Sequence, residues 1–532
     1  MTKHCLPPLS ATEFRSNVGW KAELYRDTQE NQFSNFRFVE QFFYKKEHVN
    51  TVIRILSLAR KLDFRSLLME KLSEGDLKQR IDAGVSAVDC KFTSSEIYRL
   101  SFFSCPVTQA PDQEDFLGYA VIKADFYHKN PAEPHVYVYE SVLASHRSEH
   151  ARLERRMNFL HCKRNYTVEN NFGKFSVTGA MYAQQNRRNI RCAHVALRSV
   201  LSLLTKDDIS YDEINEIVGR PSHSRDGLPP AQISAVLVKR GVFSRLIDRE
   251  RFLATKTPSF SRILYGCIES GCPALLTFYP RGDRIGHVVP VLGHTFDEDS
   301  WTPESRNSYF TVPKSKKQLK TPCFNGFEDD RESHNTYFPS EGWIDSFLIH
   351  DDNFGPYQTL PRNCFGEDDS IILWGLHTNS AALCFDRVET IALEVCQNFI
   401  SKSAERYPSD FEWYDRFLHC SHENKLVLRS LFANKKHYIE HVSKNILEEK
   451  HLVVLRERLP DQFWIVEFSC RELFSATRAK FGEVLLSADK VNEKFIGEHK
   501  PLVLRLPGVI HFYPDNYTGE TALSKRTPLF SQ

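Results

Sequence analysis

Apolar and polar positions in the first third of the chain follow two different periods. Apolar residues recur at helical spacing over 48–62, and a helical continuation is expected over 64–72. Segments rich in aromatic and β-branched residues come next, bounded by Pro, Asp and Asn, and they predict three strands, at 98–105, 116–127 and 135–143. Helical spacing returns over 146–160. This region is therefore expected to be helical first and strand-rich afterwards.

The middle third alternates shorter helices with apolar strands. An extended segment over 174–185 leads to three predicted helices, at 192–204, 210–219 and 229–241. Apolar runs predict three strands, at 273–279, 287–296 and 343–352. The polar stretch 297–339 is long for a loop, so we expect an inserted hairpin or flap.

The last third mixes both kinds of element and shows no internal repeat. Its pattern predicts helices over 387–400 and 434–450. It also predicts strands, at 425–430, 451–457, 463–469, 481–488 and 501–508. Together the patterns indicate an α+β protein in three regions: an N-terminal domain over 1–170, a central domain over 171–368 and a mixed C-terminal domain over 369–532.

Composition narrows the class of protein. The chain has 532 residues and a net charge of +1, so no strong field of one sign favours nucleic acid or an anionic membrane. No apolar run approaches the roughly 20 residues of a membrane span. The 13 cysteines include no Cys-x-x-Cys pair, and the chain opens without an apolar signal core. We therefore expect a cytoplasmic protein with reduced thiols and with no metal or cofactor.

Cys192 is the first candidate for chemistry. It stands where the polar run before it gives way to the apolar helix 192–204. The free N–H groups and the positive dipole end of a helix N-terminus favour a thiolate over a thiol. Thiol enzymes use such a nucleophile together with a base from another element.

Residues elsewhere in the middle third supply the partners for such a thiol. His287 opens a predicted strand directly after Gly286, at a rim position suited to a general base. A carboxylate at the end of a later strand would orient the imidazole, and we expect Asp351, with Asp352 as the alternate, to do so. The amide of Gln185, or alternatively Gln184, and the Cys192 N–H are candidate oxyanion donors.

The run MYAQQNRRNIRCAHVALRSVL resembles the Gln-then-Cys signature of papain-like cysteine peptidases. It is similar in particular to the branch that holds the bacterial peptidases cleaving double-glycine leader peptides. GHVVPVLGH matches that branch's strand-opening His, and FLIHDD matches its later Asp. The resemblance spans about 176–361. It implies a papain-like fold in the middle of the chain, a Gln185, Cys192, His287 and Asp351 site, a polypeptide or protein substrate, and a bacterial type of protein.

Three interpretations of this site remain open from the sequence. The first is a peptidase or isopeptidase, with the flap over the cleft and a protein partner recognised by the flanking regions. The second is a transglutaminase-type acyltransferase that uses the same side chains with an amine acceptor. The third is an inactive protease fold that serves as an interaction scaffold, with Cys192 as an inert buried thiol.

Other conspicuous side chains are expected to be structural. His194 lies two positions beyond Cys192 and so points away from it on a helix, and Cys267 and Cys272 are expected to pack in the core. Glu467 stands inside an apolar strand, where we expect it to pair with Lys or Arg across the sheet or to line a binding groove.

Overall fold

A computed structural model describes most of the chain. The described residues are 12–15, 21–26, 50–72, 92–105, 111–127, 130–144, 159–185, 192–205, 207–221, 226–248, 260–279, 286–296, 310–313, 334–362, 370–384, 388–403, 412–423, 425–444, 447–488, 499–513, 517–520 and 527–530. Among them, no helix combines the length and the apolar character needed to cross a bilayer.

The chain divides into two compact units. Unit 1 comprises Met1–Leu246, Pro273–Thr295 and Ser346–Trp374, and unit 2 comprises Ile247–Cys272, Phe296–Asp345 and Gly375–Gln532. This division differs from the predicted boundaries after residues 170 and 368. The reason is that strands and helices from outside the range 171–368 complete the central sheet and its surroundings.

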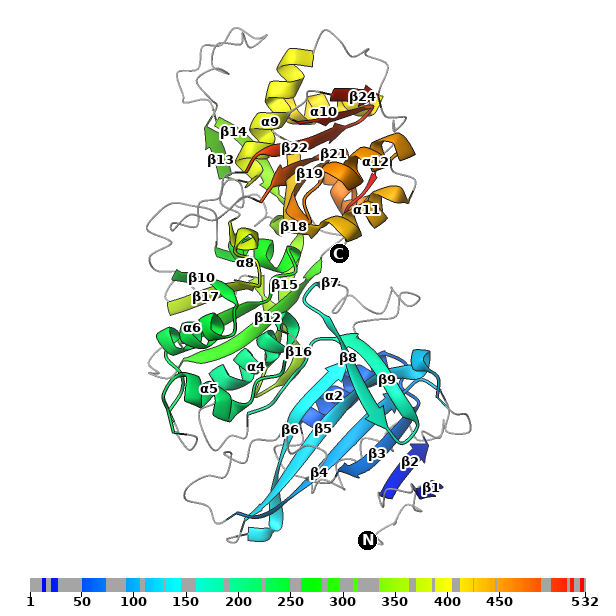
Figure 1. The fold of residues 1–532 in the computed structure, drawn as a ribbon, viewed down its shortest axis with the longest axis vertical. Helices are drawn as coiled ribbons and strands as arrows, with labels where there is room; N and C mark the ends of the chain where they lie inside the picture. The colour runs from blue at the N-terminus through cyan, green and yellow to red at the C-terminus, as the bar shows by residue number, and fades with distance from the viewer. Residues whose placement is uncertain are drawn as a thin grey trace, which may run out of the picture. The chain divides into compact units, whose positions relative to one another are not determined.

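A six-stranded antiparallel sheet with the order β1-β2-β3-β4-β5-β6 forms the first part of unit 1. Its strands are β1 (Thr12–Arg15), β2 (Lys21–Arg26), β3 (Ser66–Leu72), β4 (Phe92–Phe103), β5 (Phe116–Tyr127) and β6 (Asn130–Leu143). Helix α2 (Asn50–Lys61) contacts β5 and β6, and the hairpin of β8 (Arg164–Asn170) and β9 (Gly173–Gly179) packs against the same sheet (Figure 1). The three strands predicted in this region are confirmed.

The predicted helical continuation over 64–72 is wrong, because Ser66–Leu72 is strand β3. Asp63 has a φ of 65°, which ends α2, and Leu67, Leu68 and Met69 are consecutive buried residues. A strand that is covered on both faces carries such an apolar run, and periodicity alone does not separate it from a helix. The helix predicted over 146–160 lies outside the described residues except for β7 (Phe159–Leu160).

The central sheet carries the candidate residues. Its order is β10-β17-β11-β12-β15-β16, and β7 pairs with β12. The strands are β10 (Phe243–Asp248), β11 (Ala274–Tyr279), β12 (His287–Phe296), β15 (Ile344–Asp351), β16 (Gly355–Pro361) and β17 (Ser370–His377). Helices α4 (Cys192–Leu204), α5 (Tyr211–Ile217) and α6 (Pro230–Lys239) pack on one another beside this sheet, with α4 in contact with β11 (Figure 1).

Unit 2 is built on an eight-stranded sheet in which only β14 and β18 pair in parallel. Its strands, in order across the sheet, are β13 (Phe310–Pro313), β14 (His334–Pro339), β18 (Leu426–Asn434), β19 (Gln462–Cys470), β21 (Gly482–Ser487), β22 (Pro501–Leu506), β23 (Val509–Phe512) and β24 (Tyr517–Glu520). The short strands β20 (Ala479–Lys480) and β25 (Thr527–Pro528) pair separately.

Helices cover both faces of this sheet. Trp464 and Val466 share a core with α9 (Val388–Ser403) and α10 (Glu412–His422), whereas Phe463 and Ile465 share a core with α11 (Lys435–Ser443) and α12 (Glu449–Arg458). Since neighbouring strand residues point to opposite faces, the two helix pairs lie on opposite sides, as Figure 1 also shows. Helices α8 (Phe260–Glu269) and α13 (Arg471–Thr477) complete the unit.

One expectation for unit 2 needs correction, and a second can be followed in part. The strand predicted over 451–457 is part of helix α12, in which His451, Leu452 and Leu455 are buried at helical spacing and Val453 is exposed. The stretch 297–339, expected to be an inserted hairpin or flap, is described only at 310–313 and 334–339. There β13 and β14 form an antiparallel hairpin that extends the sheet of unit 2. The rest of that stretch lies outside the described residues.

Glu467 is buried at the centre of this sheet and is paired, as one of its two expected roles requires. It lies opposite Arg429 on β18, which bonds it at 2.7 Å, and Lys480 also contacts it. Cys267 and Cys272 lie in the core shared with α9 and α10, so the expectation that they pack there is confirmed.

Candidate active site

The candidate nucleophile stands at the first residue of helix α4. Cys192 has 5% of its surface exposed, and its Sγ lies 3.9 Å from the carbonyl oxygen of Gly286, the residue before β12. As an N-terminal residue of a helix, Cys192 has a backbone N–H with no partner within that helix. Helix α4 has the bounds predicted from the sequence, 192–204. Its start lies beside the start of β12, because Cys192 contacts the residue before that strand.

His287 begins β12 and links the thiol to two carboxylates. Its Nε2 lies 3.2 Å from Oδ2 of Asp351 and 3.5 Å from Oδ1 of Asp352. The Cys192 side chain is close enough to contribute to the raised pKa of His287. The structure thus brings together four side chains, from the start of α4, the start of β12 and the end of β15.

The electrostatics of this cluster favour a charged imidazole. Burial alone would lower the pKa of His287, but the hydrogen bonds with Asp351 and Cys192 and the charges of Asp352 and Asp351 outweigh it and raise that pKa to about 10. Burial acts on Asp351 in the opposite direction, yet its bond to His287 holds the pKa of this carboxyl below its usual range. His287 is therefore an imidazolium at neutral pH.

Both aspartates reach the imidazole, although only one was expected to do so. The register of β15 against β16 shifts between Ile349 and Asp351, and the strand ends at Asp351. Strict alternation of side chains is lost at such an irregularity, so neighbouring carboxylates can face the same side. Asp351 is further held by the N–H groups of Asn353 and Phe354, at 2.8 and 3.1 Å.

The two glutamines before the helix have different surroundings. Gln184 is 2% exposed, and its side chain donates to Thr51 Oγ1 and accepts from the N–H of Val138, both at 2.9 Å. Gln185 is only partly buried, and its Nε2 donates to Oδ1 of Asn353 at 2.9 Å. An amide nitrogen carries two N–H groups, so Gln185 has a second donor in addition to the one that bonds Asn353.

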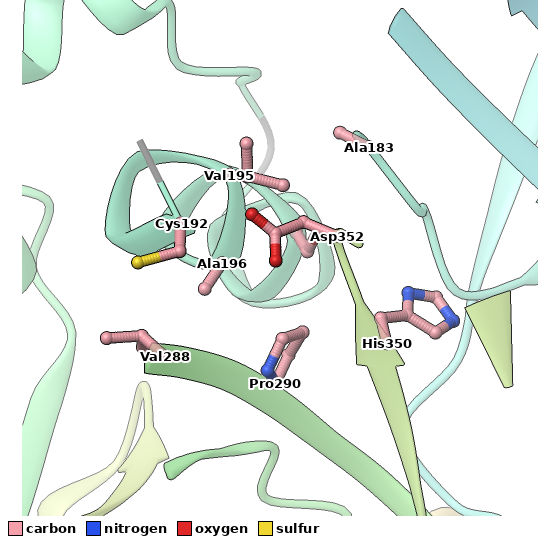
Figure 2. Close-up of a pocket in the computed structure, with 9 residues that line it drawn as sticks. Ala183, Cys192, Val195, Ala196, Val288, Pro290, His350 and Asp352 are labelled. Carbon is pink, nitrogen blue, oxygen red and sulfur yellow. The ribbon is translucent and has the colours of Figure 1, made fainter. Parts of the chain in front are cut away.

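A small pocket adjoins the thiol. Cys192, Val195 and Ala196 of α4 line it together with Val288 and Pro290 of β12 and with Asp352, as Figure 2 shows. His350 also lines the pocket, but its ring turns away from the thiol in Figure 2, and its Nδ1 lies 3.2 Å from the carbonyl oxygen of Met181. Burial lowers the pKa of His350 to about 3, so this ring stays neutral.

Two further histidines take structural positions. His194, expected to be structural, is buried, and its Nε2 bonds Oδ1 of Asn215 on α5 at 2.9 Å. His294, seven residues beyond His287, stacks on His161 with ring centroids 5.1 Å apart. Neither ring contributes to the cluster around Cys192.

His287, Asp351 and Asp352 offer ligand atoms that lie within 4.8 Å of one another, a separation that could also suit a metal ion. The Cys192 side chain acts on the same imidazole and raises its pKa, so the three groups suit a thiol–imidazole site equally well.

Two residues that support the site, Asn353 and Arg54, had no counterpart in the sequence analysis. Asn353 joins Gln185 to the Asp351 turn, and its place directly after two aspartates was a usable signal. Arg54 of α2 donates to the carbonyl oxygens of Pro356 and Tyr357, at 3.4 and 2.9 Å. A contact between residues this far apart leaves no local pattern in the sequence.

Comparison with protein-family models, with curated proteins and with solved structures gave no match to this chain.

Proposed function

We propose that this protein is a cysteine peptidase or isopeptidase that hydrolyses an amide of a polypeptide, with Cys192 as nucleophile and a papain-like arrangement of the middle of the chain. The observation that carries the proposal is the placement of Cys192, at the first residue of α4 and 3.9 Å from the Gly286 carbonyl oxygen, directly beside the His287 that bonds Asp351. A thiol at a helix start, a base and an orienting carboxylate are the parts that thiol catalysis needs.

The reaction follows from the charges in the site. The sulfur, with its proton held by His287, attacks the carbonyl carbon of the amide. The tetrahedral oxyanion is stabilised by the Cys192 N–H and the Gln185 amide. The imidazolium then donates its proton to the leaving amine, which gives a thioester, and neutral His287 takes a proton from the water that hydrolyses it. Asp351 and Asp352 stabilise the imidazolium in both halves.

The free thiols fit a cytoplasmic site of action, which we also propose. All cysteines in the described part of the chain are unpaired by disulfides and buried, as expected where the surroundings are reducing.

The decisive experiment is alkylation with iodoacetamide at neutral pH, with each cysteine followed by mass spectrometry. Cys105 is the internal control, since it is 6% exposed against 5% for Cys192, while burial and the Asp115 charge raise its pKa. We expect Cys192 to be alkylated much faster than Cys105 in the wild type and to lose that lead in His287→Ala.

Equal alkylation of Cys192 and Cys105, unchanged in His287→Ala, would refute the proposal and favour the inert scaffold. If Cys192 is reactive, trapping of its acyl-enzyme with glycine ethyl ester distinguishes an acyltransferase from a hydrolase, since only the former would prefer the amine to water.

A further inference from the structure

Phe354 is an apolar side chain exposed next to the proposed catalytic residues. It is 72% exposed and lies three positions after Asp351. An aromatic ring in water gains nothing from the hydrophobic effect until another apolar group covers it. Its place beside the His287 and Asp351 pair makes the substrate the group most directly available to do so.

The backbone holds this ring at a fixed place relative to the site. The N–H of Phe354 donates to Oδ1 of Asp351 at 3.1 Å, and its carbonyl oxygen accepts from Gln358 Nε2 at 3.0 Å. Asp351 uses its other carboxylate oxygen for His287. One carboxylate therefore fixes both the imidazole and the backbone that carries Phe354.

The following residues fix the turn further. Gly355 has a φ of +114°, and a Cβ there would meet the side chain of Arg54 at 3.0 Å. Tyr357 has a φ of 50°, a conformation that costs energy for a residue with a side chain and that tends to occur near functional sites. Since Arg54 bonds the carbonyl oxygens of Pro356 and Tyr357, the turn is held from a second side.

The exposed apolar surface of Phe354 is large enough to pack against one side chain but too small to bind a folded protein. A stable protein interface buries about 800 Å² on each partner, whereas a phenylalanine supplies at most about 150–250 Å². Among the described residues of unit 1, the other large exposed apolar side chains are Val238, Phe243 and Leu246, which lie on α6 and the edge strand β10.

We propose that Phe354 is a specificity-determining residue that packs against an apolar side chain of the polypeptide bound at Cys192. This inference rests on the proposed function and adds to it the class of substrate: a polypeptide with an aromatic or large aliphatic residue close to the cleaved bond.

The test uses acetylated alanine peptides that end in a chloromethyl ketone, with a single phenylalanine moved through the second, third and fourth positions from the reactive carbon. For each variant, the rate of Cys192 labelling is divided by its rate with iodoacetamide, so that changes in thiol reactivity cancel. We expect one phenylalanine probe to react about tenfold faster than the all-alanine probe, which corresponds to about 1.4 kcal/mol.

The ratio of the rate with the phenylalanine probe to the rate with the all-alanine probe should fall to about one in Phe354→Ala. It should be largely kept in Phe354→Leu. The matched control is Phe243→Ala, which removes another exposed phenylalanine of unit 1 and should leave the preference unchanged. If the preference for a phenylalanine probe persists in Phe354→Ala, the inference is wrong. It is also wrong if no phenylalanine probe is preferred by any variant while iodoacetamide still alkylates Cys192 in a His287-dependent way. In both cases the proposed function stands. Failure of Cys192 to react with iodoacetamide faster than Cys105 overturns the proposed function itself.

Discussion

A single imidazole with two carboxylates on one nitrogen defines this site at the scale of residues. Asp351 and Asp352 both approach Nε2 of His287. One carboxylate is enough to orient a histidine. The second adds negative charge, which shifts the equilibrium further toward the imidazolium.

That equilibrium predicts how stability depends on pH. The folded pKa of His287, about 10, lies above its ordinary value of 6.5. Its charged contacts therefore stabilise the fold fully below about pH 6.5 and lose their effect as the pH rises toward 10. A hydrogen bond to a charged group contributes about 1.5–3 kcal/mol, so His287→Ala should lower the free energy of unfolding by about that amount at pH 6.

The measurement is urea unfolding of wild type and His287→Ala at several pH values between 6 and 10. The difference between the two proteins should shrink steadily across this window, apart from a constant contribution from packing. A difference that does not change with pH would mean that His287 is neutral in the folded state.

Some residues of the candidate site could be predicted from the local sequence, and others could not. Cys192 at a helix start and His287 at a strand start were readable because a change of hydrophobic pattern marks each position. The simultaneous approach of Asp352 was not, since it depends on the register shift in β15. Arg54 was missed because its partners belong to β16, far along the chain.

Helix α4 is held at the scale of elements by one buried cation. Arg198 is 1% exposed, and it donates to the carbonyl oxygen of Tyr139 at 3.0 Å and to the carboxylate of Glu140 at 2.7 Å, both on β6. A further bond at 3.0 Å reaches Asp208, beyond the end of α4. The helix with Cys192 is thereby fastened to the first sheet of unit 1.

Arg198→Met should destabilise the protein by about 3–5 kcal/mol, because it leaves the buried carboxylate of Glu140 without its cation. Thermal or urea unfolding measures the loss, and the double variant Arg198→Met, Glu140→Gln should recover part of it. Arg240→Met is the matched control: Arg240 pairs with Glu213 at 2.7 Å, but its partner's side chain is 38% exposed, and such pairs contribute only about 0–1 kcal/mol. Equal losses in the two single variants would contradict this account of α4.

Elements were predicted well where the hydrophobic pattern included many apolar positions and poorly where it included few. The thirteen residues of α4 and the strands β5, β12 and β19 followed their patterns. Ser66–Leu72 and Glu449–Arg458 were exchanged between strand and helix, since each offers only a few apolar positions. Which side of such a segment meets the core depends on neighbours that the segment does not contain.

At the scale of the whole molecule, each of the two units is built from segments that are not continuous in the sequence. The predicted central domain, 171–368, lacks Thr51 and Arg54 of α2, Glu140 of β6 and the whole of β17. Each of these supports residues around Cys192 or the sheet beside it. The division into two units could not be predicted from the sequence, because composition does not change where these contacts form.

A fragment of residues 171–368 should therefore show no cooperative thermal transition, and Cys192 in it should react with iodoacetamide no faster than its other thiols. The fragment 1–377, which includes every strand of both sheets of unit 1, is the control and should retain a transition. Cooperative unfolding of the shorter fragment together with a fast Cys192 would show that the first 170 residues are dispensable for the site.

Strand β17 carries a consequence for the order in which the protein is made. It lies between β10 and β11 in the central sheet, yet the ribosome synthesises it after both of them and after Cys192, His287 and Asp351. An emerging chain that already holds every proposed catalytic side chain thus still has an incomplete sheet, because pairings between distant segments form late. Translation would then set when the proposed site is complete. The Cys192 thiol would become reactive only after β17 has left the ribosomal exit tunnel and paired with β10 and β11.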